Sequence, residues 1–208
     1  MKNMRKYDFK NFKIHLDTNF KDSLRLLENS NTDWEEAVDV FSDFFEELEK
    51  MPISTERNVK MLLATRFFNH ILSSLILTLY GLYVDSVICS RTAIESLAAF
   101  KLICANPKKA ELYSKGKFLL PIEVRKELEN LGYTTEANNI RTIYKSDSEL
   151  THITRDHERF SMDYNHSTKD GQLFVGGHFS KDDAEHMIKY LPTLIHWFLM
   201  PLDNTISD

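Results

Sequence analysis

Two long apolar segments that flank a single glycine constrain the fold of this chain more than any other feature. Apolar side chains recur at helical spacing from Ser54 to Tyr80 and again from Tyr83 to Ala105, and Gly81 is the only glycine or proline in this stretch. Because so short a connection joins helices that run in opposite directions, the pattern predicts an antiparallel helix hairpin. Both helices are apolar on nearly all sides, so we expect the hairpin at the centre of the protein.

Part of the hairpin raises the question of a membrane span. The run from Phe67 to Val84 contains no Asp, Glu, Lys or Arg, and its length is close to the roughly 20 residues that a bilayer requires. Several polar or small residues interrupt it: Asn69, His70, Ser73, Ser74, Thr78 and Gly81. We therefore expect a buried core helix and no contact with a membrane.

The remainder of the chain is also predicted to be helical. Its 208 residues suit one packed domain, and 6 glycines and 5 prolines are too few for the turns of an all-β or doubly wound fold. We expect an all-α bundle around the hairpin at about 55–105, in a single domain 1–208 with an N-terminal arm at 1–30. The other expected helices are Leu16–Leu27, Thr32–Lys50, Lys108–Ser114, Pro121–Leu131, Thr135–Lys145, Ser148–Asn165 and Ser180–Phe198.

Charge and motif content exclude several classes of function. The net charge of -5 argues against nonspecific coating of nucleic acid. The sequence has no phosphate-binding loop, dinucleotide fingerprint, nucleophile elbow or C-x-x-C pair. Most of its 8 histidines follow residue 150, but their spacing matches no metal-binding motif, so we expect neither a metal nor a cofactor. No signal-peptide pattern opens the chain, which predicts a cytoplasmic protein.

One pair of charged residues lies within the second helix of the hairpin. Arg91 and Glu95 are four positions apart, so they face the same side of an otherwise apolar helix. Because a charge in such a place needs a partner, one interpretation is a half-buried ion pair that fixes the register of the hairpin. The other interpretation is a polar pocket in which Arg91 or Glu95 orients His166.

The best candidate for chemistry is the run from Arg159 to His166. On a continuous helix these two residues stand two turns apart on one face, about 10 Å along the axis. Metal-free cleavage of RNA needs a group that titrates near neutral pH and a fixed cation beside the phosphate. We therefore predict that His166 is the general acid or base and that Arg159 holds the phosphate, with Tyr164 and Asn165 orienting the nucleotide.

The helical geometry also predicts a dimer. A helical arginine leans towards the N-terminus of its helix, so Arg159 leans away from His166 of its own chain. A symmetric homodimer that brings two copies of the motif together restores a shared site.

The hairpin residues Leu75–Ser86, the following Ser90–Glu95 and the Arg159-x6-His166 motif resemble the HEPN superfamily. The resemblance covers roughly residues 55–200. Members that retain an R-x(4-6)-H motif commonly act as metal-independent ribonucleases in toxin, phage-defence and CRISPR-associated systems, usually as dimers with the motif at the interface. The resemblance implies Arg159 and His166 as the catalytic pair, RNA as the substrate, a homodimer, and an antitoxin or other protein as a partner.

Two other interpretations stay open. Many HEPN relatives have lost activity, and Phe160 follows the motif arginine where active members usually carry a polar residue. In that case the chain is a noncatalytic helical module that binds a protein partner or a small ligand, with Arg91, Glu95 and His166 as a polar core. The third class, a metal-dependent hydrolase built on the late histidines, predicts stoichiometric metal in the purified protein.

Overall fold

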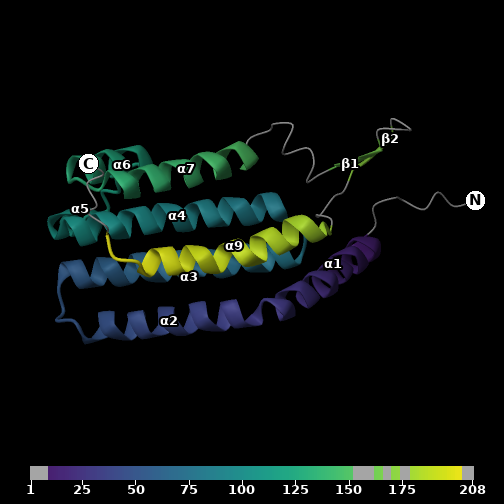
Figure 1. The fold of residues 1–208 in the computed structure, drawn as a ribbon, viewed down its shortest axis with the longest axis horizontal. Coiled ribbons are helices and arrows are strands. Elements are labelled where there is room, and N and C mark those ends of the chain that lie inside the picture. The colour runs from purple at the N-terminus through teal and green to yellow at the C-terminus, as the bar shows by residue number, and fades with distance from the viewer. Residues whose placement is uncertain (1–8, 152–161, 166–169, 174–178, 203–208) are drawn as a thin grey trace, which may run out of the picture.

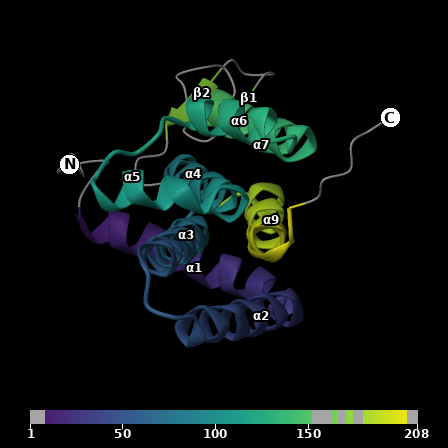
Figure 2. The same ribbon diagram turned by 90° about the vertical axis from the view of Figure 1, so that its left-hand side faces the viewer.

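The computed structural model describes residues 9–151, 162–165, 170–173 and 179–202. These residues form an all-α bundle of helices, accompanied by one short pair of strands (Figure 1). The long helices run nearly parallel to one another in Figure 1, and the view along them in Figure 2 shows α4 between α3 on one side and α7 on the other. The predicted all-α fold class is confirmed.

The centre of the bundle is the hairpin of α3 (Thr55–Leu79) and α4 (Tyr83–Ala105). The hydroxyl of Ser54 caps α3 by accepting a hydrogen bond of 3.1 Å from the backbone N–H of Arg57. Gly81 has a φ of 75° in the connecting turn, a conformation that glycine adopts without the steric penalty of a side chain. The hairpin and its central position, both predicted from the sequence, are confirmed.

Three hydroxyl side chains inside the hairpin bond to one another. The hydroxyl of Ser86 lies 2.8 Å from that of Ser74 and 2.7 Å from that of Thr78, and all three residues are buried. The run Phe67–Val84 is not one helix, because the chain turns at residues 80–82. By length and hydropathy alone, α3 is the one described helix that suits a bilayer span, and 39% of its apolar window is buried. Core helices meet the same criterion, and the packing of α3 against α4 agrees with the predicted core helix.

Helices α1 (Phe9–Asn29), α2 (Asn31–Lys50) and α9 (Lys181–Leu199) pack on the α3 side of the hairpin. The indole N–H of Trp34 in α2 donates to the carbonyl of Ile188 in α9 at 3.0 Å. The rings of Phe67 and Phe198 stack with their centroids 4.4 Å apart at the junction of α3 and α9. These contacts form one aromatic core between the N-terminal and C-terminal helices.

The prediction of an arm with a short helix from Leu16 was wrong, because α1 already begins at Phe9. The reason is that α1 packs against α3 and α9, and local periodicity does not indicate such tertiary contacts. Asn19 donates to the carbonyl of Tyr80 at 3.2 Å and the rings of Phe20 and Tyr80 lie 5.1 Å apart, so the turn of the hairpin holds α1.

The opposite side of α4 is covered by α6 (Pro121–Asn130) and α7 (Thr134–Thr151). The chain reaches them through η1 (Pro107–Lys109) and α5 (Ala110–Ser114). The predicted end of a helix at Lys145 was wrong, because α7 continues to Thr151. Asp147 explains the continuation: its side chain is buried against α4 and bonds to Ser90 there, so tertiary contact extends the helix.

Two short strands follow in sequence, β1 (Met162–Asn165) and β2 (Asp170–Leu173), and they pair antiparallel. The predicted helix Ser148–Asn165 is therefore wrong over β1. Asp163 and Asn165 are poor helix formers and Tyr164 favours strands, so pairing with β2 decides the conformation.

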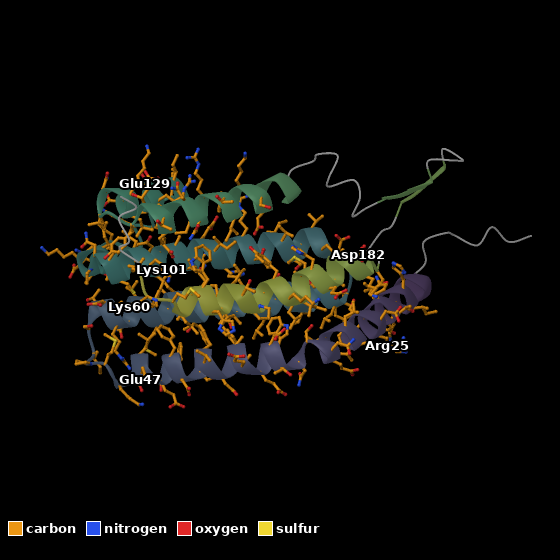
Figure 3. All side chains as sticks on the ribbon, in the orientation of Figure 1. Arg25, Glu47, Lys60, Lys101, Glu129 and Asp182 are labelled. Atoms are coloured by element: carbon orange, nitrogen blue, oxygen red, sulfur yellow. The ribbon has the colours of Figure 1, made fainter. Side chains whose placement is uncertain are left out.

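A buried ion pair joins three helices at the other end of the bundle. The Lys101 ammonium on α4 lies 3.7 Å from the Glu136 carboxylate on α7 and also donates to the carbonyl of Met200 after α9. The indole N–H of Trp197 donates to the second oxygen of Glu136 at 3.3 Å. Figure 3 shows Lys101 in the interior of the bundle and Glu47 at its outer edge. Lys101 and Glu136 are only 2% and 8% exposed, so each stabilises the charge of the other.

Candidate functional site

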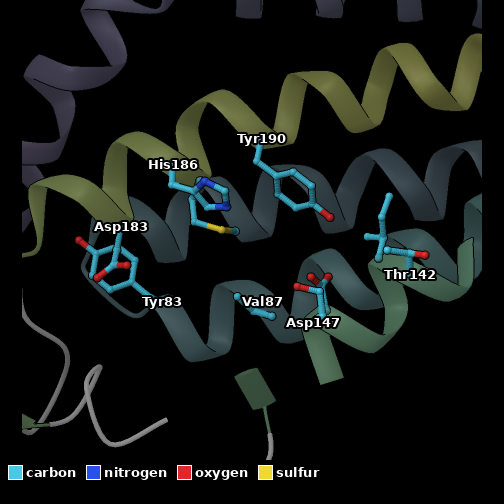
Figure 4. Close-up of a pocket in the computed structure, with 10 residues that line it drawn as sticks. Tyr83, Val87, Thr142, Asp147, Asp183, His186 and Tyr190 are labelled. Carbon is cyan, nitrogen blue, oxygen red and sulfur yellow. The ribbon is translucent and has the colours of Figure 1, made fainter. Parts of the chain in front are cut away.

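A pocket of about 320 Å³ lies between α7 and α9, with α4 as its floor (Figure 4). A second hollow of about 330 Å³ adjoins it further along the same two helices and shares three lining residues with it, namely Thr142, Ile143 and Tyr190. We call the two together the α7–α9 groove. Its lining is mostly apolar with a few polar groups, as is usual for sites that bind small molecules.

Asp147 places a carboxyl group in the wall of the groove. The residue is 6% exposed, and its Oδ2 lies 3.0 Å from the hydroxyl of Ser90 on α4. The same hydroxyl lies 3.0 Å from the carbonyl oxygen of Val87. Because a hydroxyl carries one proton, both contacts are fully satisfied only when Asp147 is protonated and donates to Ser90.

The protonation of Asp147 follows from its surroundings. Burial raises the pKa of the Asp147 carboxyl to about 6, while the bond from Ser90 and the positive charge of Arg91 oppose that shift. The group therefore changes its charge close to neutral pH, unlike an exposed aspartate.

Tyr190 supplies the second polar group of the groove. Its hydroxyl oxygen is buried and has no hydrogen-bond partner among the residues that the structure describes. Burial, assisted by the nearby charge of Asp147, raises the pKa of Tyr190 above its usual value, so the phenol remains a donor at all physiological pH values. Figure 4 shows the Tyr190 hydroxyl and the Asp147 carboxyl directed into the same space from opposite walls. A buried hydroxyl without a partner costs free energy, which a bound ligand would recover.

Aromatic rings form part of the remaining walls. The ring of His186 lies parallel to that of Tyr190, with an interplanar angle of 7° and centroids 5.9 Å apart. Tyr83 is buried on the floor; its hydroxyl donates to the carbonyl of Ser180 at 3.0 Å and accepts from the N–H of Ser180 at 3.1 Å. Ser180 in turn caps α9 through the N–H of Asp183. These bonds fix the start of α9 against α4 and so set the width of the groove.

Arg91 and Glu95 face the same side of α4, as predicted, and both are half-buried. They meet at Tyr144 of α7: the Arg91 guanidinium donates to the Tyr144 hydroxyl, which donates to Glu95 at 3.3 Å. The carbon at the centre of the guanidinium lies 4.3 Å from the centroid of the Tyr144 ring. The cluster joins α4 to α7, so it fixes the register between these helices, whereas the prediction placed that role within the hairpin.

The predicted catalytic residues Arg159 and His166 lie outside the described residues. The supporting residues Tyr164 and Asn165 both lie in β1. Since β1 is extended, the prediction that Arg159 and position 166 share the face of one continuous helix is wrong. The segment is nevertheless covalently connected to both helices of the groove, because it follows α7, which ends at Thr151, and precedes α9, which begins at Lys181.

Sequence reasoning missed Asp147, Tyr190 and His186. A signal for Asp147 was present, since it continues the apolar stripe of Ile140 and Ile143 on α7, where a carboxyl group must be buried. No such signal marks Tyr190, because a tyrosine on an apolar helix face is ordinary in a protein core.

Comparison of the chain with protein-family models, curated proteins and solved structures finds no match. The resemblance to the HEPN superfamily stays a prediction from the sequence.

Proposed function

We propose that this protein is a HEPN-type, metal-independent endoribonuclease whose catalytic pair is Arg159 and His166. The observation that carries the proposal is the position of the motif in the chain. The segment with Arg159 and His166 connects the end of α7 to the start of α9, and these two helices form the walls of the α7–α9 groove. A nucleotide bound in the groove would therefore lie between the two helices to which the motif segment is covalently connected.

The reaction uses the 2′-hydroxyl of RNA as its nucleophile. The 2′-oxygen attacks the adjacent phosphorus, the bond from phosphorus to the 5′-oxygen breaks, and a 2′,3′-cyclic phosphate and a 5′-hydroxyl result. His166 takes the proton from the 2′-hydroxyl or gives one to the leaving 5′-oxygen. Arg159 holds the charge that gathers on the phosphate, and Tyr164 and Asn165 orient the nucleotide.

The resemblance also supports a cytoplasmic homodimer that acts in defence or stress, in the manner of a toxin. Sedimentation should then give a mass of twice the 24.3 kDa of one chain. Induced expression of the wild type should slow bacterial growth, and that of His166→Ala should not. Equal growth with the two proteins would remove the toxin role.

The activity itself is tested by cleavage of an RNA panel in the presence of EDTA. Arg159→Ala and His166→Ala should each lower the cleavage rate about 100-fold or more, since a donor that stabilises transition-state charge and a general acid or base each contribute at least that factor. Arg155→Ala and His157→Ala remove the same side-chain types from the same segment and should leave the rate unchanged. Equal rates in all five proteins would overturn the catalytic assignment.

The noncatalytic binding module is the second candidate, and one observation favours it. Arg91, Glu95 and Tyr144 satisfy one another within the protein, as a structural polar cluster would. In this alternative a ligand binds in the α7–α9 groove and no RNA is cleaved. Cleavage by the wild type that is lost in His166→Ala would exclude it.

A further inference from the structure

We propose that the α7–α9 groove binds a guanine base, and that Asp147 and Tyr190 recognise its Watson–Crick edge. The inference rests on the proposed function in one respect, because it assigns the groove to a base of the RNA substrate. The binding step itself does not depend on catalysis and can be measured separately.

The carboxylate of Asp147 can accept hydrogen bonds from two neighbouring donors. Its Oδ2 is bonded to Ser90, and neither oxygen has another hydrogen-bond partner among the described residues. A carboxylate accepts two parallel N–H bonds when the donors are adjacent and coplanar. Guanine presents such donors in N1–H and the exocyclic N2 amino group.

The buried hydroxyl of Tyr190 completes the pattern. Guanine carries the carbonyl O6 next to N1–H on the same edge, so a base that pairs with Asp147 presents an acceptor beside that carboxylate, where a neighbouring donor can reach it. The Tyr190 hydroxyl is an unpartnered donor aimed into that space (Figure 4). Bound guanine would therefore satisfy a buried group that the protein leaves unpaired.

The other bases lack this edge. Adenine and cytosine each place one amino group beside a ring nitrogen that accepts, which would face the carboxylate lone pairs. Uracil has a single N–H between two carbonyls, and one of those would also meet the carboxylate. Two adjacent donors beside a carbonyl distinguish guanine, and a site built on buried polar groups rejects bases that leave them unpaired.

The dimensions and the aromatic wall also suit a base. A volume of about 320 Å³ lies at the lower end of the range for small-molecule sites. The parallel rings of His186 and Tyr190 line the groove, and single-stranded RNA bases are commonly held on aromatic rings.

Protonation of Asp147 would remove one of the two acceptors. The groups around this carboxyl are Ser90 and Arg91 on α4 and Tyr190 on α9. The titratable side chains of Asp183 and His186 line the same groove. Guanine affinity should therefore be constant between about pH 7 and pH 8, and it should fall as the pH decreases below about 6. A loss of affinity between pH 7 and pH 8, where N1 of guanine keeps its proton, would contradict the assigned role.

Calorimetric titration of the full chain with the four nucleoside 5′-monophosphates tests the recognition. Guanosine monophosphate should bind at least about tenfold more tightly than the other three. Asp147→Asn should weaken it about 10- to 100-fold, and Tyr190→Phe about 3- to 10-fold. Asp182→Asn makes the same chemical change at an exposed position of α9 and should have no effect. Equal binding of the four nucleotides, or no binding, would overturn the inference.

Single-stranded RNA and a free nucleotide both present guanine, and competition separates the two sources. With His166→Ala, which should not cleave, an oligonucleotide containing one guanosine should displace guanosine monophosphate, and the matching adenosine oligonucleotide should not. Failure to displace would assign the site to a free nucleotide and overturn the substrate role. RNA cleavage without guanine binding would leave the proposed function intact and remove this inference. Guanine binding without cleavage of any RNA would remove the proposed function and leave the guanine site intact.

Discussion

Replacement of Asp147 by asparagine should make the protein more stable at alkaline pH. Asparagine has nearly the same shape, keeps an oxygen acceptor for Ser90 and carries no charge to bury. The buried carboxyl has a pKa of about 6, compared with 3.8 for the exposed group. One pKa unit corresponds to about 1.36 kcal/mol, so the ionised carboxylate costs at most about 3 kcal/mol of folding free energy.

The sign follows from proton binding. Because the pKa is raised in the folded protein, the folded state binds more protons than the unfolded state between pH 3.8 and about 6. The contribution of Asp147 to stability therefore decreases as the pH rises through this window and is constant above it. Asp147→Asn does not titrate, so its advantage over the wild type should grow from pH 4 to pH 7 and then level off.

Thermal unfolding followed by circular dichroism provides the measurement. For a chain of this size, 3 kcal/mol corresponds to an increase in Tm of roughly 6–12 °C at pH 8. Asp182→Asn makes the same change at an exposed position, so the difference in Tm between this variant and the wild type should not depend on pH. A difference between Asp147→Asn and the wild type that does not change from pH 4 to pH 8, or a variant less stable at pH 8, would refute the reasoning.

Three further predictions concern the scaffold, each measured by urea denaturation. Lys101→Met should cost about 3–5 kcal/mol because Glu136 remains buried without its cation, and adding Glu136→Gln should restore part of the loss; a loss under 1 kcal/mol would contradict the ion pair. Ser86→Ala should cost about 1–3 kcal/mol, since the buried Thr78 hydroxyl loses its bond to Ser86 and the Ser74 hydroxyl keeps only the backbone carbonyl of residue 86; unchanged stability would mean that the Thr78 hydroxyl finds another partner. Gly81→Ala should cost about 1–2 kcal/mol because of the positive φ, whereas no loss would show that the turn relaxes.

The central hairpin could be predicted from the sequence because the residues that determine it lie within the hairpin itself or next to it. Apolar side chains at helical spacing, the cap at Ser54 and the glycine at Gly81 all act within a few residues of the helices that they define. α9 is of the same kind, with Ser180 as its cap. For such elements the tertiary structure adds packing and does not change the boundaries.

Elements decided by distant contacts were mispredicted. α1 is longer than predicted because it packs against α3 and α9, and α7 continues past Lys145 because Asp147 reaches α4. β1 depends on its pairing with β2, and Tyr164 alone does not indicate a partner.

The candidate site shows the same limit. Arg91 and Glu95 could be identified as a pair from their spacing, but their shared partner Tyr144 lies on another helix. The α7–α9 groove exists because both helices pack on α4 and leave a space between them. The spacing between two helices cannot be predicted from a local sequence pattern. The facing of Asp147 and Tyr190 therefore required the structure.

The chemical ends of the RNA products test the central claim most directly. A guanosine-containing RNA incubated with the full chain in EDTA and analysed by mass spectrometry should yield 2′,3′-cyclic phosphate and 5′-hydroxyl ends, and His166→Ala should yield neither. Products with 3′-hydroxyl and 5′-phosphate ends, products that persist in His166→Ala, or intact RNA would contradict the account.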